Sequence, residues 1–281
     1  MIQSSPTVRL ELESRPEAVT LVRSMLAGVA EPLAFDPELL DDLRTAVSEA
    51  CNNVVLHAYD DGPGPLLVAL DVDGNDVEVV VRDRGSGIQY VATAATDRMG
   101  VGLAVISALA DRAEFLTRSD GGTEVRMSFS ARGVGVRVPK GSPVRELEQW
   151  SPDLVGDVVV KLAPVDLLAA VLGRVSRALA AAARFSLDRF SDVYLVTDAI
   201  AAQAQVASRS WIGFAIGIST RRLEILIGPF PSGTGARLAG ELAEQPGGPL
   251  ATLADELIVE PDGEFEMVRV VLLDKREPAT G

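Results

Sequence analysis

Three polar residues, Glu49, Asn53 and His57, recur at intervals of four within the stretch from Phe35 to Tyr59. At 100° per residue they share one flank of a helix, so a carboxylate and an amide one turn apart can act at the same point. A carboxylate can accept a proton from a hydroxyl group or a water, and an amide oxygen can coordinate a hard cation. The same spacing is also typical of a solvated helix face, so these residues alone leave both interpretations open.

The elements around these residues must hold them in place. Asp36 precedes the expected helix as an N-cap, and Pro37 takes the favoured first position. The opposite flank is apolar and wide enough to pack on a core, and its members are Leu40, Leu43, Val47, Ala50, Cys51, Val54 and Ala58. The pattern therefore predicts an amphipathic helix that packs one face and presents the other.

Three glycine-containing motifs follow this helix in the chain. The first is a strand ending in Asp83 and a turn with Gly85 and Gly87, the second is a glycine pair that opens an amphipathic helix, and the third is a turn and strand. Their sequences are VEVVVRDRGSGI (77–88), RMGVGLAVISALADRAEF (98–115) and GGTEVRMSF (121–129). A single G-x-G is weak evidence, whereas four motifs in this order favour a nucleotide site.

In this order the motifs resemble those of the GHKL (Bergerat-fold) ATPases, over about residues 5–130. SEACNNVVLHAY and VRDRGSGI are most similar to the anti-sigma-factor serine kinases of the RsbW type. The resemblance implies that Glu49 is the general base and that Asn53 binds Mg²⁺. It also implies that Asp83 accepts a hydrogen bond from the exocyclic amine of adenine and that Thr123 lies near the adenine ring. Asn52 is a poorer metal ligand than Asn53, and His57 is as often a cap or packing residue.

The glycines have physical roles of their own in such a site. Gly85 and Gly87 permit positive φ and let the backbone run flat under a base. Gly100 and Gly102 are expected to precede a helix, whose free N–H groups and dipole would face phosphates. Arg98 could pair with the γ-phosphate or be solvated. An ordinary strand-ending turn around Asp83 and a plain β-turn before Thr123 are the alternatives.

The pattern of expected elements defines the fold class. Strands at 7–12, 66–72 and 77–83, helices at 15–29 and 100–111, and two later strands predict an α+β two-layer sandwich. Helices would cover one face of a mixed, mostly antiparallel sheet, which is the Bergerat fold. The lid at 88–99 is short, which suits an enzyme that phosphorylates a docked protein or a protein that only holds ATP.

The second half of the chain repeats the pattern of the first. A shift of 150 residues places TVRLEL over DVVVKL and Phe35 over Phe185. The same shift turns Glu49 into Ala199 and Asn53 into Gln203, and a shift of 146 turns Asp83 into Pro229. We therefore predict a kinase domain at 1–132, a linker at 133–150 and a degenerate GHKL-like domain without an intact nucleotide site at 151–281. The two halves could form an internal pseudo-dimer; two unrelated α+β domains are the alternative.

Composition limits the functions to consider. The net charge of −14 gives no basic stripe for nucleic acid, and no long apolar run indicates a membrane segment. One cysteine excludes an internal disulfide and suits the cytoplasm, and with one histidine it makes a zinc site implausible. The motif residues Glu49, Asn53 and Asp83 predict an ATP- and Mg²⁺-dependent serine/threonine kinase. The resemblance alone implies that it binds a sigma factor and phosphorylates an antagonist protein. A non-catalytic ATP-binding regulator and a histidine-kinase fragment are the alternatives.

Overall fold

The computed structural model describes residues 8–86, 97–119, 121–130, 154–207, 211–240 and 249–275. The chain divides into two compact units, Met1–Glu148 and Gln149–Gly281. The linker predicted at 133–150 lies outside the described residues.

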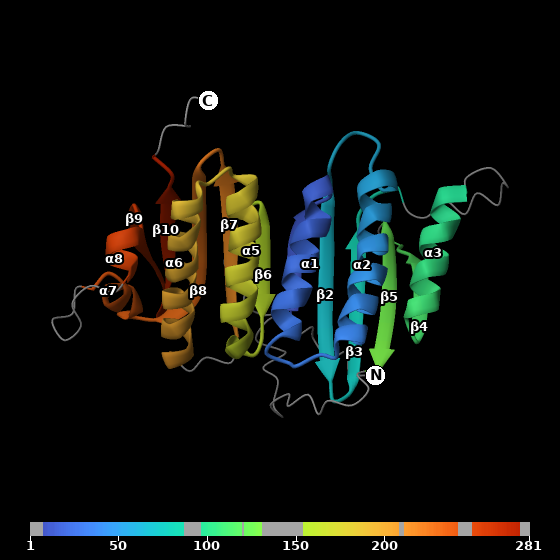
Figure 1. Ribbon diagram of the computed structural model, residues 1–281, viewed down its shortest axis with the longest axis horizontal. Coiled ribbons are helices and arrows are strands. Elements are labelled where there is room, and N and C mark those ends of the chain that lie inside the picture. Colours follow the sequence, from blue (N-terminus) through green and yellow to red (C-terminus); the bar gives the residue numbers. More distant parts are fainter. Residues whose placement is uncertain are drawn as a thin grey trace. The chain divides into compact units, whose positions relative to one another are not determined.

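The first unit is an α+β sandwich in which helices cover one face of an antiparallel sheet (Figure 1). Its strands lie in the order β4-β5-β3-β2-β1, and each neighbouring pair is antiparallel. The elements are β1 (Val8–Glu13), α1 (Pro16–Ala30), α2 (Pro37–His57), β2 (Pro65–Asp73), β3 (Asp76–Asp83), α3 (Asp97–Leu109), β4 (Arg112–Thr117) and β5 (Thr123–Ser130). The predicted fold class is confirmed.

Helix α2 begins as the sequence indicates and packs its apolar flank. The Asp36 carboxylate accepts from the Glu38 backbone N–H at 2.9 Å, and Pro37 is the first helical residue. Leu43, at the centre of the buried stripe, is fully buried. The prediction was wrong at one position, because Leu39 is buried and Leu40 only half-buried. The core-facing stripe extends from Leu43 toward Ala46, the side of the helix on which Leu39 lies.

The second unit has the same topology as the first. Its strand order β6-β7-β8-β10-β9 matches β1-β2-β3-β5-β4, and again each described pair is antiparallel. The elements are β6 (Val158–Leu162), a 3-10 turn η1 (Val165–Leu167), α5 (Leu168–Ala182), α6 (Leu187–Val206), β7 (Ile212–Ser219), β8 (Arg222–Pro231), α7 (Thr234–Leu238), α8 (Pro249–Leu253), β9 (Glu256–Asp262) and β10 (Phe265–Leu273).

Local details repeat at the shift of 150 residues as well. The N–H of Phe35 donates to Ala30 O at 3.0 Å, and that of Phe185 donates to Ala180 O at 3.0 Å. The preceding residue has a positive φ in both units, 52° at Ala34 and 62° at Arg184. The two units therefore close the corner between their first two helices in the same way. Common ancestry of the halves and their pairing as a pseudo-dimer stay predictions.

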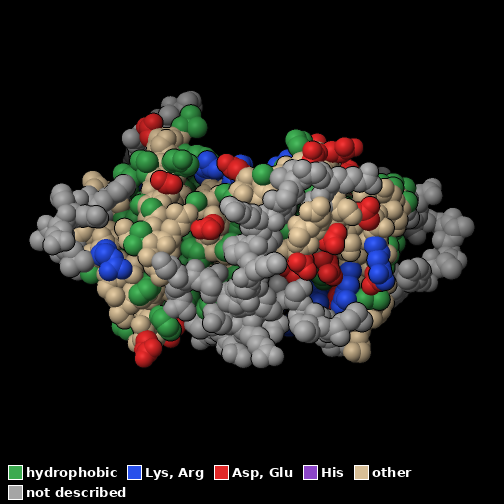
Figure 2. All heavy atoms as spheres, turned by 90° about the horizontal axis from the view of Figure 1, so that it is seen from below, with side chains coloured by type: hydrophobic (Ala, Val, Ile, Leu, Met, Phe, Trp, Pro, Cys, Tyr) green, Lys and Arg blue, Asp and Glu red, His purple; other side chains and the backbone are tan. Residues whose placement is uncertain are grey.

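Charges on the described surface are mixed. On the face drawn in Figure 2, described Lys and Arg side chains lie among carboxylates rather than in one continuous basic stripe. Among the helices of the described ranges, none has the length and apolar character needed to cross a membrane.

One ion-pair cluster lies at the ends of β3 and β5. Glu124 alternates along β5 with the buried Val125, so it projects from the sheet face opposite the helices. Its side chain is only 4% exposed and forms ion pairs with Arg82 of β3 at 2.5 Å, Arg118 at 3.1 Å and Arg126 at 2.5 Å. Because Arg82 precedes Asp83 and Glu124 follows Thr123, the cluster joins the two strands where their motif residues lie.

Burial alone would raise the pKa of Glu124, but the hydrogen bonds and charges of Arg126 and Arg82 outweigh it and leave that pKa below its ordinary value. A lowered pKa in the folded state means that the unfolded chain binds more protons as the pH falls below about 4.5. The stabilisation is therefore complete above that pH and is lost as the pH falls through the folded-state pKa.

We predict that Glu124→Gln lowers the free energy of unfolding near pH 7 by on the order of 1–3 kcal/mol, because three arginines lose their anionic partner. Urea unfolding at a series of pH values should show that the difference from the wild type shrinks as the pH falls toward 3. Glu78→Gln, at an exposed position on the same face, is the control and should change little. A difference for Glu124→Gln that stays constant with pH would contradict the prediction.

Candidate functional site

Glu49 and Asn53 lie on the flank of α2 that faces α3. A Cβ atom built at Gly102 of α3 would lie 3.2 Å from Glu49 Oε2 and 3.4 Å from Asn53 Oδ1. The structure thus brings the helix that carries Glu49 and Asn53 next to the glycine-pair helix, and a side chain at position 102 would crowd both polar groups. A carboxylate oxygen and an amide oxygen there can serve a proton transfer and a hard cation.

The glycine pair differs from its expected place. Helix α3 begins at Asp97, so Gly100 lies in its first turn and Gly102 in the second, and the expectation that both precede the helix was wrong. The N–H groups that lack partners within a helix are those of its N-cap and first three residues, so in a helix that begins at Asp97 neither Gly100 nor Gly102 supplies one of them. Gly102 instead allows the close approach of α3 to α2.

The second group of motif residues meets around the buried carboxylate of Asp83, which is 4% exposed. Its Oδ1 accepts from the backbone N–H of Gly85 at 2.8 Å and from that of Thr123 at 3.1 Å. Among the described residues, both of these bonds end on Oδ1, which leaves Oδ2 as the oxygen that could accept from the exocyclic amine of a nucleobase. Hydrogen bonds to the single atom Asp83 Oδ1 thereby hold together the end of β3, the turn after it and the start of β5.

Glycine is required at two positions next to this carboxylate. A Cβ at Gly85 would lie 1.9 Å from the carbonyl oxygen of Ala58, and one at Gly122 would lie 2.2 Å from Asp83 O. Gly122 also has a φ of +83°, which L-residues with side chains rarely adopt. These glycines let the backbone segments approach each other closely at the carboxylate.

Some predicted site residues are not placed by the structure. Gly87 and residues 88–96 of the expected lid lie outside the described residues, as does the side chain of Arg98. His57 is exposed in the last turn of α2, and Asn52 is half-buried beside Asn53. The buried Cys51 packs in the core, where burial raises the pKa of its thiol to about 12, so it carries no reactive thiolate at neutral pH.

The sequence reading missed one residue at the site, Tyr59. Its hydroxyl donates to Pro65 O at 2.6 Å and accepts from the N–H of Arg84 at 2.8 Å. Arg84 directly follows Asp83, so Tyr59 links the end of α2 to the turn beside the buried carboxylate. The sequence feature that could have indicated it is an aromatic residue just ahead of the glycine-rich turn DGPGP.

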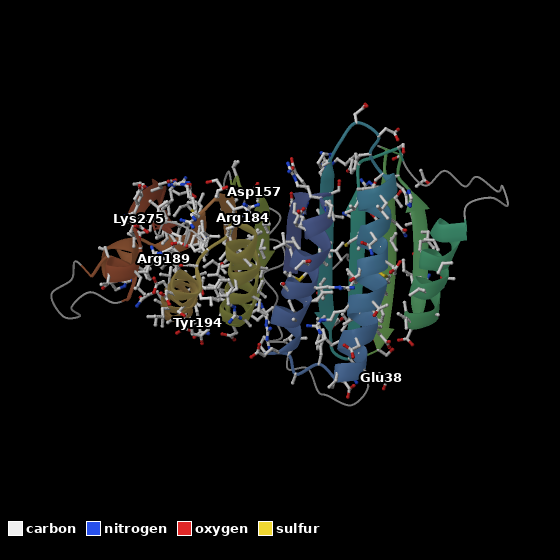
Figure 3. The ribbon with its side chains drawn as sticks, turned by 45° about the horizontal axis from the view of Figure 1, so that its top comes forward. Glu38, Asp157, Arg184, Arg189, Tyr194 and Lys275 are labelled. Carbon is white, nitrogen blue, oxygen red and sulfur yellow. The ribbon has the colours of Figure 1, made fainter. Side chains whose placement is uncertain are left out.

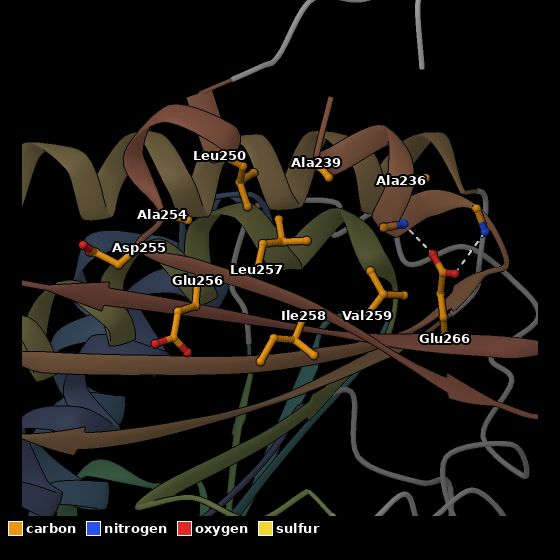
Figure 4. Close-up of a pocket in the computed structure, with 12 residues that line it drawn as sticks. Ala236, Ala239, Leu250, Ala254, Asp255, Glu256, Leu257, Ile258, Val259 and Glu266 are labelled. Atoms are coloured by element: carbon orange, nitrogen blue, oxygen red, sulfur yellow. Dashed lines mark hydrogen bonds between the residues drawn. The ribbon is translucent and has the colours of Figure 1, made fainter. Parts of the chain in front are cut away.

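The second unit has a different arrangement at the corresponding place. Pro229 stands where the register places Asp83, and the segment after β8 forms the short helix α7. The buried Glu266 of β10 accepts from the N–H of Gly233 at 3.0 Å and from that of Gly235 (Figure 4). A cavity of about 730 Å³ borders this carboxylate, lined by residues of α7, α8 and β9. Both oxygens of Glu266 are thus used by the turn of its own unit.

Charged side chains of α6 and the last strand are also paired internally. Arg189 and Lys275, which lie near each other in Figure 3, both bind Asp255, Lys275 at 2.6 Å. The N–H of Leu273 donates to the same carboxylate at 2.8 Å. Burial would raise the pKa of Asp255, but its bonds to Lys275 and Leu273 and the charge of Arg189 leave that pKa lowered. These contacts tie α6 to β9 and β10.

The residues of the first unit fit ATP with Mg²⁺. At one end Glu49 and Asn53 present a carboxylate and an amide oxygen beside Gly102, groups that could act as a base and as a cation ligand. At the other end Asp83 supplies a carboxylate suited to an adenine amine. This fold and this donor set define the class of GHKL-type ATPase domains, and residues 12–129 match the family model described as a histidine kinase-like ATPase domain.

Curated relatives narrow the class. The chain is 31% identical over 162 residues to the serine-protein kinase RsbW of Bacillus velezensis (strain DSM 23117 / BGSC 10A6 / LMG 26770 / FZB42), covering 53% of this chain and 99% of the relative. It is 29% identical over 90 residues to RsbW of Bacillus thuringiensis (strain Al Hakam), covering 32% of this chain and 56% of that relative. The chain therefore belongs to the RsbW family of kinase-like ATPases.

Among solved structures, the chain is similar to the RsbU and RsbW domains of Rv1364c from Mycobacterium tuberculosis. The sequences are 26% identical, and the match covers 43% of this chain and 31% of that chain. The TM-score of this match is 0.36.

We predict that Gly102→Ala weakens binding of Mg²⁺-ATP by about tenfold, or roughly 1.4 kcal/mol, because the new methyl group crowds Glu49 and Asn53. Its folding should not suffer, since alanine is favoured over glycine inside a helix by about 1 kcal/mol. Calorimetric titration and thermal unfolding measure the two effects. The matched control is Gly173→Ala in α5, where the nearest side-chain atom is Thr197 Oγ1 at 3.8 Å. Unchanged affinity in Gly102→Ala would contradict the placement of the phosphate end.

Proposed function

We propose that this chain is an ATP- and Mg²⁺-dependent serine/threonine protein kinase of the anti-sigma type, which binds a sigma factor and phosphorylates an antagonist protein in the cytoplasm. The observation that carries the proposal is the meeting of Glu49, Asn53 and Gly102 on two helices of one domain. Asp83 and Thr123 complete the site at its other end. The names of the RsbW relatives support phosphorylation of serine.

Each residue has a task in phosphoryl transfer. Bound Mg²⁺-ATP would supply the phosphoryl group and the charge neutralisation that its transfer requires. Glu49 would accept the proton of the attacking hydroxyl, and Asn53 would hold the cation through its amide oxygen. Asp83 would favour adenine over guanine, because guanine presents a carbonyl oxygen where adenine presents an amine.

The presence of a carboxylate at position 49 favours a kinase over a protein that only holds ATP. Binding alone requires the cation ligand and the adenine contact but no base. Glu49 lies where a Cβ at Gly102 would meet its Oε2, on the same side of α2 as Asn53. A base beside the cation ligand is the arrangement that transfer to a hydroxyl needs.

The second half would have lost nucleotide binding. In this proposal residues 1–132 form the kinase domain, 133–150 the linker and 151–281 a degenerate GHKL-like domain. The shared strand order supports a common fold, while Ala199, Gln203 and Pro229 replace the three polar positions. The carboxylate of Glu266 is already bonded to its own turn.

We expect calorimetry with Mg²⁺ to show one ATP bound per chain, since only the first unit keeps the binding residues. Asp83→Asn should weaken ATP binding by at least about tenfold, because the amide cannot accept as the carboxylate does from both backbone N–H groups and the adenine amine. Asp198→Asn, at an exposed position of α6 in the second unit, is the matched control. Two ATP molecules per chain would refute the degenerate second unit, and a folded wild type that binds no ATP would refute the proposed function.

Loss of the base should separate binding from transfer. Glu49→Gln should bind ATP within about threefold of the wild type while transfer falls by roughly 10²–10⁴-fold. The assay follows radiolabelled γ-phosphate into purified anti-sigma-factor antagonist proteins from the same genome, and mass spectrometry identifies the labelled residue. Equal rates for wild type and variant would exclude Glu49 as the base. ATP binding without labelling of any such protein would favour the non-catalytic regulator.

A further inference from the structure

Tyr59 joins the helix that carries Glu49 and Asn53 to the turn that carries the adenine side of the site. We infer that Tyr59 is a positioning residue that sets the selectivity of the chain for adenine nucleotides, by holding the turn Arg84–Ser86 at a fixed place relative to α2. The inference rests on the proposed function, because it concerns the same nucleotide site.

Two hydrogen bonds make the link. The N–H of Arg84 donates to the Tyr59 hydroxyl at 2.8 Å, and the N–H of Ser86 donates to the carbonyl oxygen of Ala58 at 3.0 Å. Ala58 and Tyr59, which directly follow α2, thus accept from the N–H groups of Ser86 and Arg84 in the turn. The intervening Gly85 donates to Asp83 Oδ1 at 2.8 Å. All three N–H groups of the turn therefore have acceptors, two of them in the segment that ends α2.

The ring of Tyr59 is itself anchored at the start of β2. A Cβ at Gly64 would lie 2.3 Å from the ring, so the ring lies directly against the glycine backbone. The N–H of Gly64 donates to Ser14 Oγ at 3.0 Å, and the N–H of Ser14 donates to Gly64 O at 2.8 Å. The Tyr59 hydroxyl then donates to Pro65 O at 2.6 Å. The segments at the end of β1 and the start of β2 thus hold the phenol in place. Its bond with Arg84 in turn fixes the end of β3.

The hydroxyl must act as donor and acceptor at once, which requires its neutral form. Burial raises the pKa of Tyr59, the N–H of Arg84 acts in the opposite direction, and the negative charge of Asp83 raises it further. The hydroxyl therefore stays protonated throughout the neutral pH range. Phenylalanine at this position would keep the ring and leave the Arg84 N–H without its acceptor.

The consequence for nucleotide choice follows from the position of Asp83. Its Oδ1 is held by Gly85 and Thr123, so a displacement of the turn moves the carboxylate and with it Oδ2. Discrimination between adenine and guanine depends on that one oxygen meeting an amine rather than a carbonyl. Since Asn53 lies on α2 and Tyr59 follows the C-cap residue of that helix, the link fixes the adenine end relative to the phosphate end.

The test compares ATP and GTP binding by calorimetry in the full-length chain, on wild type, Tyr59→Phe, Asp83→Asn and the control Tyr194→Phe. Tyr194 lies in α6 of the second unit, where the guanidinium carbon of Arg177 lies 5.6 Å from the centroid of its ring. We expect Tyr59→Phe to weaken ATP binding about tenfold and GTP binding much less, so that the preference for ATP falls several-fold. The ratio of the two affinities, measured on one folded sample, would not change if Tyr59 only stabilised the fold.

Hydrogen exchange supplies a second measurement. The peptide spanning residues 82–86 should exchange faster in Tyr59→Phe than in the wild type, while peptides of α1 and of the second unit stay unchanged. Gly64→Ala, whose methyl group would displace the ring, should lower the ATP preference in the same direction and serves if Tyr59→Phe does not fold.

The outcomes separate the two proposals. Loss of ATP binding in Asp83→Asn with an unchanged ATP preference in Tyr59→Phe and Gly64→Ala would overturn this inference and leave the proposed function standing. A wild type that binds neither nucleotide would remove the proposed function and the inference together. Loss of preference in Tyr194→Phe as well would show a general effect on folding and would also overturn the inference.

Discussion

The burial of the Asp83 carboxylate is the constraint on which the first unit depends. An ionised carboxylate removed from water is costly unless backbone or side-chain donors replace the lost hydration. Here two backbone N–H groups, from Gly85 and Thr123, meet the same oxygen. That requirement brings the turn after β3 and the start of β5 to one place, where a side chain at Gly122 would meet the backbone carbonyl of Asp83 and one at Gly85 that of Ala58.

The second unit shows how the same topology is used without that carboxylate. Pro229, which stands where the register places Asp83, carries no charge. In the segment after β8, the backbone N–H groups of Gly233 and Gly235 donate to Glu266 of the neighbouring strand β10. The donors are again satisfied, but both oxygens of the carboxylate are consumed by the protein. A shared strand order is therefore compatible with very different sites, since the polar residues at the strand ends decide what the site can bind.

In the first unit the site has two ends that are carried by different elements. Helix α2 supplies Glu49 and Asn53, and α3 approaches them closely because Gly102 has no side chain. Behind the sheet, Glu124 with its arginines fixes β3 against β5 on the face that the helices do not cover. The two ends of the site are thus joined through the helix on one side and through the sheet on the other.

The parts of the first unit that depend on local chemistry could be predicted from residue types and their spacing. Hydrophobic periodicity placed α1, α2 and the hairpin of β2 and β3, and the cap at Asp36 followed from residue preference alone. The order and spacing of the four motifs indicated the family, which the relatives confirmed. Spacing on one helix also put Glu49 and Asn53 on one flank, because a helix fixes the directions of its own side chains.

Contacts between elements that lie far apart in the sequence could not be predicted in this way, because they depend on how the elements pack. Helix α3 begins at Asp97, so Gly102 lies inside the helix and next to Glu49 and Asn53 of α2 rather than ahead of the helix. The bond from Arg84 to Tyr59 spans 25 residues, and that from Thr123 to Asp83 spans 40. Periodicity carries no information on such pairs, because they depend on the packing of whole elements and on which buried donors lack a partner.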